Sequence, residues 1–364
     1  MSKIRIKAGA DMKLTIFGLT ISSSWGNGHA TIWRGLCRSF ARRGHEVTFF
    51  EQDVSYYSQH RDLTEMPGVT ICLYSDWDSV EPLARETLSQ SDVAVVTSYC
   101  PDGAAASNVM LEYPSLIRVF YDMDTPVTLQ ALERGEKVPY LSPRRFRDFD
   151  LVLSYTGGAV LDRLKRRFGA KRVSPLYGCA DPEVHVPVPA AEAYRADLSY
   201  LGTYAEDRQS ILNQLLIQAS NELPRKKFLV GGALYPADFP WKENIWFIRH
   251  VPPPEHPQFY CSSFFTLNIT RRIMSTCGYC PSGRLFEAAA CGVPVITDWW
   301  EGLDSFFDPA SEIIVAKDTR AVVFALTMSR EEREEIARAA RKRILSDHTA
   351  DRRVQELERI LMSC

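Results

Sequence analysis

The sequence predicts an α/β protein of two domains, each a doubly wound, Rossmann-like parallel sheet with helices on both faces. Three observations carry this prediction. Short apolar runs alternate with helical segments along the chain, and a proline-rich stretch at residues 175–189 divides it into halves of similar size. The length of 364 residues also exceeds what one domain usually holds, about 100–200 residues.

In the first half, short apolar runs predict strands, and helical periodicity predicts helices between them. The helix expected at residues 30–43 is followed by Gly44, which suits a C-terminal cap. The predicted strands are residues 13–18, 46–50, 69–73, 92–97, 116–121 and 151–154, with a helix at 158–168 after the last of them. Residues 1–11 are expected to be a disordered lead-in, and residues 12–178 to form the N-terminal domain.

The second half repeats the alternation. Its predicted strands are residues 197–201, 227–231, 245–248, 264–268 and 293–297, and its predicted helices are 207–223, 285–290, 331–345 and 351–361. We expect residues 179–345 to form the C-terminal domain and residues 346–364 to pack back on the N-terminal one. Because ligands of such sheets bind outside the carboxyl ends of the strands, we expect both sets of strand ends to face one cleft.

Composition excludes several classes of protein. The formal net charge of −2 gives no overall basic field, so nucleic acid is not an expected partner. No apolar run reaches the roughly 18 residues of a membrane span, and residues 1–11 lack the apolar core of a secretory signal, so we expect a cytoplasmic protein. Nine scattered cysteines argue against a disulfide framework. Cys277 and Cys280 have the spacing of metal ligands, but the sequence has no second such pair, which argues against a structural metal site.

Two residues of the first half are candidates for catalysis. His29 follows the loop Gly26-Asn-Gly28 at a helix start, where it serves either as a base or as a structural cap. Asp124 lies in Tyr121-Asp-Met-Asp-Thr-Pro126 after a strand, where it is either a general base or the N-cap of the next helix. The loop is only a fragment of a dinucleotide-binding fingerprint, which weighs against a dehydrogenase.

The densest pattern lies in residues 264–302, where a buried strand is followed by loop, helix, turn and strand. Ser282 and Gly283 open the helix, and a helix N-terminus can hold a diphosphate. Nearby cations that can neutralise its charge are Arg271, Arg272 and Arg284. Glu287 follows Arg284 by three residues and can accept from two ribose hydroxyls. The alternative is a surface helix with an internal Arg284–Glu287 ion pair.

At these residues the chain resembles glycosyltransferases of the GT-B fold, and more narrowly the CgeB-like bacterial proteins. The C-terminal motifs that carry the resemblance are Leu267-Asn-Ile-Thr-Arg-Arg272, Pro281-Ser-Gly-Arg-Leu-Phe-Glu-Ala-Ala-Ala-Cys-Gly292 and His348-Thr349. Three N-terminal stretches are also similar: Asp122-Met-Asp-Thr-Pro126, Ser154-Tyr-Thr-Gly-Gly158 and Leu176-Tyr-Gly-Cys-Ala-Asp-Pro182.

The resemblance implies a nucleotide-sugar donor in the C-terminal domain and an acceptor on the N-terminal one. Glu287 matches the glutamate that binds ribose in the family, and Asn268 lies in the motif before it. The strand end Gly202-Thr203, with Arg208 in the helix after it, adds further phosphate contacts. Many related retaining enzymes carry a second glutamate where this chain has Tyr279. Such enzymes usually need no metal or other cofactor, and the sequence shows no metal-binding cluster.

We therefore expect a metal-independent glycosyltransferase that acts on a nucleoside diphosphate sugar and on a small-molecule, glycan or protein acceptor. If transfer inverts the sugar configuration, Asp124 or His29 supplies the base; a retaining route needs none. Two alternatives stay open: a nucleotide-sugar epimerase on the same scaffold, and a non-catalytic protein that binds a sugar nucleotide. The sequence indicates neither the nucleotide base nor the oligomeric state.

Overall fold

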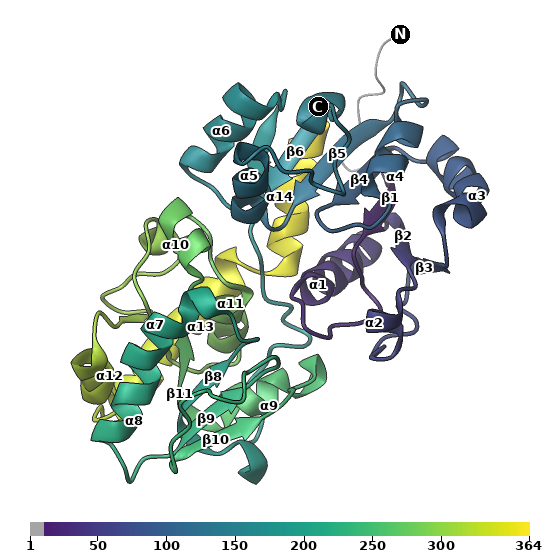
Figure 1. Ribbon diagram of the computed structural model, residues 1–364. Helices are drawn as coiled ribbons and strands as arrows, with labels where there is room; N and C mark the ends of the chain where they lie inside the picture. Colours follow the sequence, from purple (N-terminus) through teal and green to yellow (C-terminus); the bar gives the residue numbers. More distant parts are fainter. Residues whose placement is uncertain (1–10) are drawn as a thin grey trace. The chain divides into compact units, whose positions relative to one another are not determined.

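Two structural units make up the chain in a computed structural model that describes residues 11–364 (Figure 1). Unit 1 holds the described chain up to Tyr177 together with Ala350–Cys364, and unit 2 is Gly178–Thr349. The lead-in predicted at residues 1–11 falls, apart from Asp11, outside the described residues. Within residues 11–364, no helix combines the length and the apolar character needed to span a membrane.

Unit 1 is built on a parallel sheet of seven strands in the order β3-β2-β1-β4-β5-β6-β7. Apolar runs such as Val93–Thr97, in which every residue is buried, explain why helices cover both faces of the sheet. The strands are β1 (Lys13–Gly18), β2 (Glu46–Gln52), β3 (Val69–Tyr74), β4 (Val93–Thr97), β5 (Ile117–Asp122), β6 (Leu151–Ser154) and β7 (Val173–Pro175).

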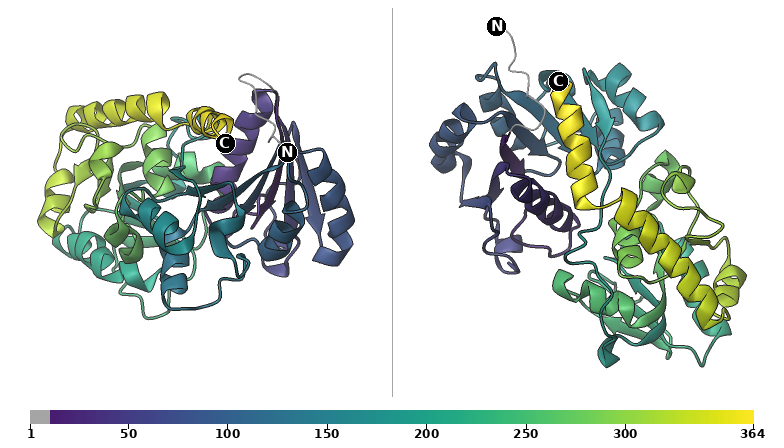
Figure 2. Two further views of the ribbon diagram at one scale, coloured as in Figure 1. Left: turned by 90° about the horizontal axis from the view of Figure 1, so that it is seen from above. Right: turned by 180° about the vertical axis from the view of Figure 1, so that it is seen from behind.

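The helices of unit 1 connect these strands, and the last helix of the chain joins them. They are α1 (His29–Arg42), α2 (Ser55–Ser58), α3 (Trp77–Ser89), α4 (Gly103–Met110), α5 (Thr125–Glu133), α6 (Ala159–Phe168) and α14 (Ala350–Met362). Helix α14 lies along α1, as the views from two sides agree (Figure 2). Nε and Nη2 of Arg43 each donate to one carboxylate oxygen of Glu358 at 2.7 Å, and this bidentate pair attaches the last helix to unit 1.

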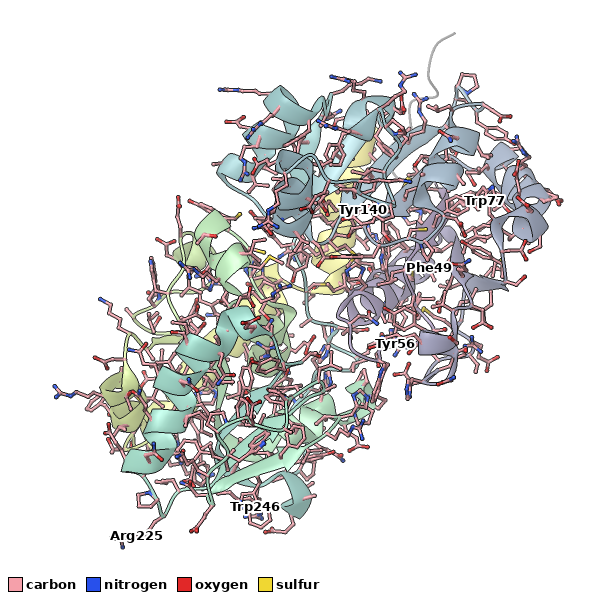
Figure 3. The ribbon with its side chains drawn as sticks, viewed as in Figure 1. Phe49, Tyr56, Trp77, Tyr140, Arg225 and Trp246 are labelled. Carbon is pink, nitrogen blue, oxygen red and sulfur yellow. The ribbon has the colours of Figure 1, made fainter. Side chains whose placement is uncertain are left out.

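Unit 2 is built on a parallel sheet of six strands in the order β10-β9-β8-β11-β12-β13. The strands are β8 (Ala196–Leu201), β9 (Phe228–Gly231), β10 (Ile245–Ile248), β11 (Ser263–Asn268), β12 (Val295–Thr297) and β13 (Ile314–Val315). The edge strand β10 exposes Trp246, which Figure 3 labels, and the Lys227 ammonium lies 4.7 Å from the centre of that ring. A covering cation is one way in which an edge strand is kept from pairing with another chain.

The helices of unit 2 include several short ones that the sequence pattern does not predict, such as α9 and α10. The full set is α7 (Gln209–Leu212), a π-helical turn (Asn213–Ile217), α8 (Gln218–Glu222), α9 (His256–Cys261), α10 (Arg272–Cys277), α11 (Gly283–Ala290), α12 (Thr319–Ala325) and α13 (Arg330–Asp347). The helix predicted at residues 207–223 is thus a 3-10 turn, α7, the π turn and α8 in direct succession. Ser329 and Glu332 form a capping box that starts α13.

Both sheets share one strand order, in which the second and third strands lie on one side of the first and the fourth to sixth on the other. This is the Rossmann order, and the prediction of two doubly wound parallel sheets is confirmed. In such sheets ligands bind where the order reverses, beside the first strand. These switch points lie between β1 and β4 in unit 1 and between β8 and β11 in unit 2, so both are the places to look for a site.

Candidate functional site

At the switch point of unit 2, side chains from β8, β11 and α11 meet around Arg284. The guanidinium of Arg284 donates to Asn268 Oδ1 at 2.8 Å and lies 5.3 Å from the centre of the Tyr200 ring. Gly202 is next to it, because a Cβ atom at this glycine would come within 2.8 Å of Arg284 Nη2. The structure therefore brings together Gly202, Asn268 and Arg284, which lie on three separate segments of the sequence.

Two further arginines join Arg284 in a positive cluster. Arg271 donates through Nε to Asp207 at 3.2 Å, and Arg208 donates through Nη1 to the backbone carbonyl of Thr203 at 3.1 Å. Burial lowers the pKa of the Arg208 guanidinium, and the charges of Arg284 and Arg271 lower it further. Its Nε is buried without a hydrogen-bond partner among the described residues. Three cations and one carboxylate leave a net positive site that suits an anion with several oxygens.

The N-terminus of α11 opens beside this cluster. Ser282 is the N-cap residue, but its side chain makes no capping hydrogen bond, and Gly283 is the first residue of the helix. The free N–H groups of a first helical turn carry a partial positive charge and bind phosphate. The helix end therefore adds a second kind of anion-binding group to the arginines.

Arg272 is not brought into the cluster. It begins α10 and is exposed, and unlike Arg271 it makes no ion pair with a carboxylate of residues 11–364. Its role in donor binding stays a prediction that the geometry does not support. Adjacent residues at a helix start point in different directions, so only one of the two arginines reaches the cluster, and the sequence does not say which one.

Glu287 lies on α11 and is largely buried, with 12% of its side chain exposed. Its Oε2 accepts from the Tyr260 hydroxyl at 3.1 Å and lies 3.5 Å from Nδ1 of His256. Burial alone would raise the pKa of this carboxyl, but His256, His185 and Tyr260 outweigh burial and lower the pKa to about 2. Glu287 is therefore an anion at any physiological pH.

The other oxygen of Glu287 faces the start of its own helix. A Cβ atom at Gly283 would lie 3.5 Å from Oε1, so the glycine leaves space beside that oxygen. The ion pair between Arg284 and Glu287, the alternative that the sequence allows, is not what forms: Arg284 bonds to Asn268 and Glu287 to Tyr260. An anionic oxygen next to a phosphate-binding helix end is suited to a ribose hydroxyl.

His185, His256 and Glu287 form a group that the sequence did not reveal. One atom of each that could bind a metal ion lies within 4.8 Å of the others. However, Nδ1 of His185 accepts from the backbone N–H of Asp181 at 3.1 Å, so its other ring nitrogen carries the hydrogen and has no lone pair for a metal. His185 therefore adds no metal ligand, which leaves at most His256 and Glu287 of this group for a cation.

Tyr279 has a backbone conformation that residues other than glycine rarely adopt. Its φ is 45°, its N–H donates to the carbonyl of Glu301 at 2.6 Å, and its ring lies against Gly302, where an added Cβ atom would overlap the ring. Only a glycine at 302 permits this contact. The aromatic side chain at this position is therefore built into the turn that ends near α11, at the place where the resemblance leads one to expect a glutamate.

In unit 1, the structure joins the two catalytic candidates directly. His29, the first residue of α1, and Asp124, the residue before α5, are 95 positions apart, yet His29 Nε2 lies 2.7 Å from Asp124 Oδ2. The same oxygen accepts from the Ser98 hydroxyl at 3.3 Å. Asp124 does occupy the N-cap position of α5, but its side chain makes no capping bond. A histidine held by a carboxylate is the arrangement of a general base.

The loop after β1 does not support a dehydrogenase. Glu51, at the end of β2, accepts from the Thr20 and Ser22 hydroxyls and from the backbone N–H groups of Ile21 and Ser22, at 2.7–2.9 Å. These bonds use both carboxylate oxygens to fix the loop. Glu51 is thus not available for the ribose contact that a dinucleotide-binding domain makes from this position.

Asp122 is a buried acid behind the His29–Asp124 pair. Burial, and next the charge of Asp124, raise its pKa to about 8, and its Oδ2 is buried without a partner among the described residues. A folded-state pKa above the ordinary value of 3.8 destabilises the fold increasingly as the pH rises from about 4 to about 8.

We therefore expect Asp122→Asn to stabilise the protein in a pH-dependent way. The gain in the free energy of unfolding should be near zero at about pH 4 and reach on the order of 5 kcal/mol at most by pH 8. Denaturant unfolding at several pH values measures it, with Asp162→Asn on the exposed face of α6 as the control. A gain that is the same at all pH values would show that Asp122 is not held neutral.

The comparisons with known proteins agree with this geometry. Residues 208–359 match the family model described as glycosyl transferase-like. No curated protein sequence matches significantly. Among solved structures, the chain is similar to sucrose-phosphate synthase from Thermosynechococcus elongatus, with a TM-score of 0.67, 12% identity, and 97% and 98% of the two chains covered.

Two further structures are similar over the whole chain. HepE from Anabaena, solved with UDP and glucose, has a TM-score of 0.68 and 13% identity, with 97% of this chain and 100% of that chain covered. An α-glucosyltransferase solved with UDP-glucose and DNA has a TM-score of 0.70 and 14% identity, with the same coverage. Since one of these proteins was solved with DNA, the comparisons give no support to the expectation that nucleic acid is excluded as a partner.

These similarities show the GT-B fold, as the sequence predicted. The narrower resemblance to CgeB-like proteins is not confirmed by them. A glycosyl transferase-like domain over residues 208–359, on a GT-B fold, makes this chain a glycosyltransferase of the GT-B type.

Proposed function

We propose that this glycosyltransferase takes its sugar from a nucleoside diphosphate donor held by unit 2 and needs no metal ion. The observation that carries the proposal is the group formed by three arginines, the open N-terminus of α11 and the anionic Glu287. These match the polar parts of a nucleoside diphosphate, because the cations and the helix end suit the phosphates and the carboxylate suits the ribose.

The same groups account for the chemistry of the donor. When the bond from the sugar to the diphosphate breaks, negative charge builds up on the phosphate oxygens. Groups that are already oriented toward that charge stabilise the transition state without a cost for reorganisation. Arg284, which is fixed by Asn268 and Tyr200, is such a group. Arginines and a helix end thereby supply the charge stabilisation that a divalent cation supplies in other enzymes.

For the acceptor, we assign activation to the His29–Asp124 pair of unit 1. A hydroxyl of a small molecule, glycan or protein loses its proton to this pair as it attacks the sugar, if the reaction inverts the configuration. The resemblance to CgeB-like bacterial proteins supports sugar transfer to an acceptor as the function, and we place this reaction in the cytoplasm. No contact within the described residues favours the epimerase or the non-catalytic alternative over transfer.

A thermal unfolding series tests the donor site. The protein is heated with each of several nucleoside diphosphates and with NAD, all in EDTA. A ligand at a hundredfold excess over its Kd stabilises the fold by about 2.7 kcal/mol. We expect one diphosphate to do so and NAD not to do so. Stabilisation by NAD alone, or by no diphosphate, would contradict the proposal.

The role of unit 1 is tested by a second pair of variants. We expect Asp124→Asn and His29→Ala each to lower the rate of sugar transfer about 100-fold, because a general base contributes factors of this size. The affinity for the diphosphate should stay within about twofold of the wild type, since both residues lie in the other unit. Unchanged transfer rates would rule out a base at this pair and favour a retaining reaction assisted by the donor phosphate.

A further inference from the structure

We propose that Tyr260, His256 and His185 are positioning residues: Tyr260 bonds one oxygen of Glu287, the two histidines lie beside the same carboxylate, and the other oxygen is left to a ribose hydroxyl, so that the three set the preference for ribonucleotides over deoxyribonucleotides. This inference rests on the proposed donor site of unit 2. It assigns a specificity role to three residues that neither the sequence pattern nor the comparisons single out.

The first two residues share one short helix. His256 and Tyr260 are four positions apart on α9, so they lie on the same face, and α9 packs against α11, which carries Glu287. Tyr260 is fully buried and donates its hydroxyl proton to Oε2 of Glu287 at 3.1 Å. Burial, and next the charge of Glu287, raise the pKa of Tyr260 well above its ordinary value, so the phenol keeps this proton.

The ring of His256 is fixed from its far side. Its Nε2 donates to the backbone carbonyl of Val251 at 3.2 Å, which directs Nδ1 toward Glu287. Nδ1 is buried, has no hydrogen-bond partner among the described residues, and lies 3.5 Å from Oε2. The carboxylate oxygen that Tyr260 already holds is thus the group that Nδ1 faces, and a hydrogen on Nδ1, in addition to the one on Nε2, is what lets the ring donate to it.

His185 approaches the carboxylate from a third segment. It is buried, and its Nδ1 accepts from the N–H of Asp181 at 3.1 Å. Its Nε2 therefore carries the hydrogen, and this atom is buried without a partner in residues 11–364. A ring nitrogen of His185 lies within 4.8 Å of a ring nitrogen of His256 and a carboxylate oxygen of Glu287, so the N–H of His185 adds positive potential near the carboxylate.

The consequence is a carboxylate with a fixed orientation and one free acceptor. Oε2 is held by Tyr260 and faces His256, whereas Oε1 faces the open space beside Gly283. An oxygen fixed in this way can bond a hydroxyl at little cost in side-chain freedom. A ligand without that hydroxyl leaves Oε1 unpaired, which is how a site built to bond a hydroxyl rejects an analogue that lacks it.

The test compares ribo- and deoxyribonucleotides by calorimetric titration in EDTA. The probes are UDP, 2′-deoxy-UDP and 3′-deoxy-UDP, or the same set on another base if the unfolding series selects one. We expect the wild type to prefer the full ribose over one of the deoxy forms by about 10- to 100-fold. Tyr260→Phe and His256→Gln should each reduce that ratio by about threefold or more, and Glu287→Gln should abolish it.

Tyr194→Phe is the matched control, because Tyr194 lies in the same unit, contacts Phe259 of α9 and donates to a different glutamate, Glu255. Its ratio should equal that of the wild type. If Tyr260→Phe and His256→Gln weaken all three ligands equally, their role is merely structural and the inference is wrong. If EDTA abolishes binding and zinc restores it, the cluster holds a metal and the inference is also wrong.

The inference can fail while the proposed function stands, since the ratio is measured only on ligands that bind. If the wild type binds no nucleoside diphosphate with or without metal, the proposed donor site itself is contradicted and the inference falls with it. The melting temperature of each variant separates loss of binding from loss of the fold, and the two α9 variants provide independent measurements of the same ratio.

Discussion

Arg284→Met is expected to lower kcat/KM for the sugar donor by about 10²- to 10³-fold. Removal of one oriented group that stabilises developing charge has an effect of this size in other enzymes. Arg284 is oriented by its bond to Asn268 and by its place over the Tyr200 ring. Methionine preserves much of the apolar length of the side chain and removes the cation.

The loss should depend on the phosphates of the ligand. Affinity for the nucleoside diphosphate should fall steeply, whereas affinity for the nucleoside alone should change little. Arg272→Met is the matched control, because Arg272 is exposed and lies outside the cluster. Equal losses for nucleoside and diphosphate, or a comparable loss in the Arg272 variant, would contradict the assignment of the phosphates to this cluster.

Removal of one cation should not destabilise the unliganded protein as strongly as removal of a paired charge would. Arg208 is buried, and Arg284 and Arg271 both disfavour its charge. The cluster holds one carboxylate, Asp207, for three guanidiniums. We interpret this excess charge as a local instability that binding of the anion relieves, which is typical of functional sites.

Glu287→Gln is expected to weaken binding of the nucleoside diphosphate about 100-fold. A hydrogen bond from a hydroxyl to a carboxylate is stronger than one to a neutral amide, and the amide also turns a donor toward the Tyr260 hydroxyl or His256. Calorimetric titration at neutral pH measures the change. An affinity within about threefold of the wild type would show that Glu287 does not bind the nucleotide.

The same variant has a stability effect with a defined pH dependence. The pKa of Glu287 falls from 4.5 to about 2 in the fold. A depressed pKa contributes stability that is present above about pH 4.5 and is lost as the pH falls toward about 2. The contribution at neutral pH is about 3 kcal/mol at about 1.4 kcal/mol per pKa unit. Binding must therefore be measured at a temperature at which the variant is fully folded.

The fold could be predicted because its strands are continuous apolar runs. In β4, all five residues are buried, and the sequence reads Val-Ala-Val-Val-Thr, a pattern typical of a strand covered on both faces. Elements without such a run were not predicted. Strand β13 is two residues long, and α10 is a six-residue helix inside a stretch whose sequence resembles a loop. Short elements of this kind depend on their tertiary contacts.

The candidate site could be predicted where one segment carries the chemistry. The segment Ser282–Glu287 places a helix N-terminus, a cation and an anion in sequence, so its role follows from local structure. The residues that hold Glu287 could not be found in this way. His256 and Tyr260 belong to a helix that the sequence did not predict, and His185 belongs to a loop far from both. Only tertiary structure brings three such segments to one carboxylate.

The sequence predicted His29 and Asp124 separately as candidates, but it could not predict that they form a pair. Each residue was singled out by its place after a parallel strand, and a purely structural role as a cap was open to each. Because the carboxyl ends of β1, β4 and β5 are neighbours in the sheet order, the loops that follow them carry His29, Ser98 and Asp124 to one point. The order of the strands, which no local pattern states, is what joins them.

The most direct test is turnover of nucleoside diphosphate sugars by the wild type in EDTA, with release of the free diphosphate followed over time. We predict that one donor is consumed, with slow hydrolysis when no acceptor is present, and that Arg284→Met slows the release about 10²- to 10³-fold. A donor that binds but is never consumed, even with candidate acceptors, would identify a non-catalytic binding protein. A sugar that is isomerised without release would identify an epimerase, and either result would contradict sugar transfer as the function of this protein.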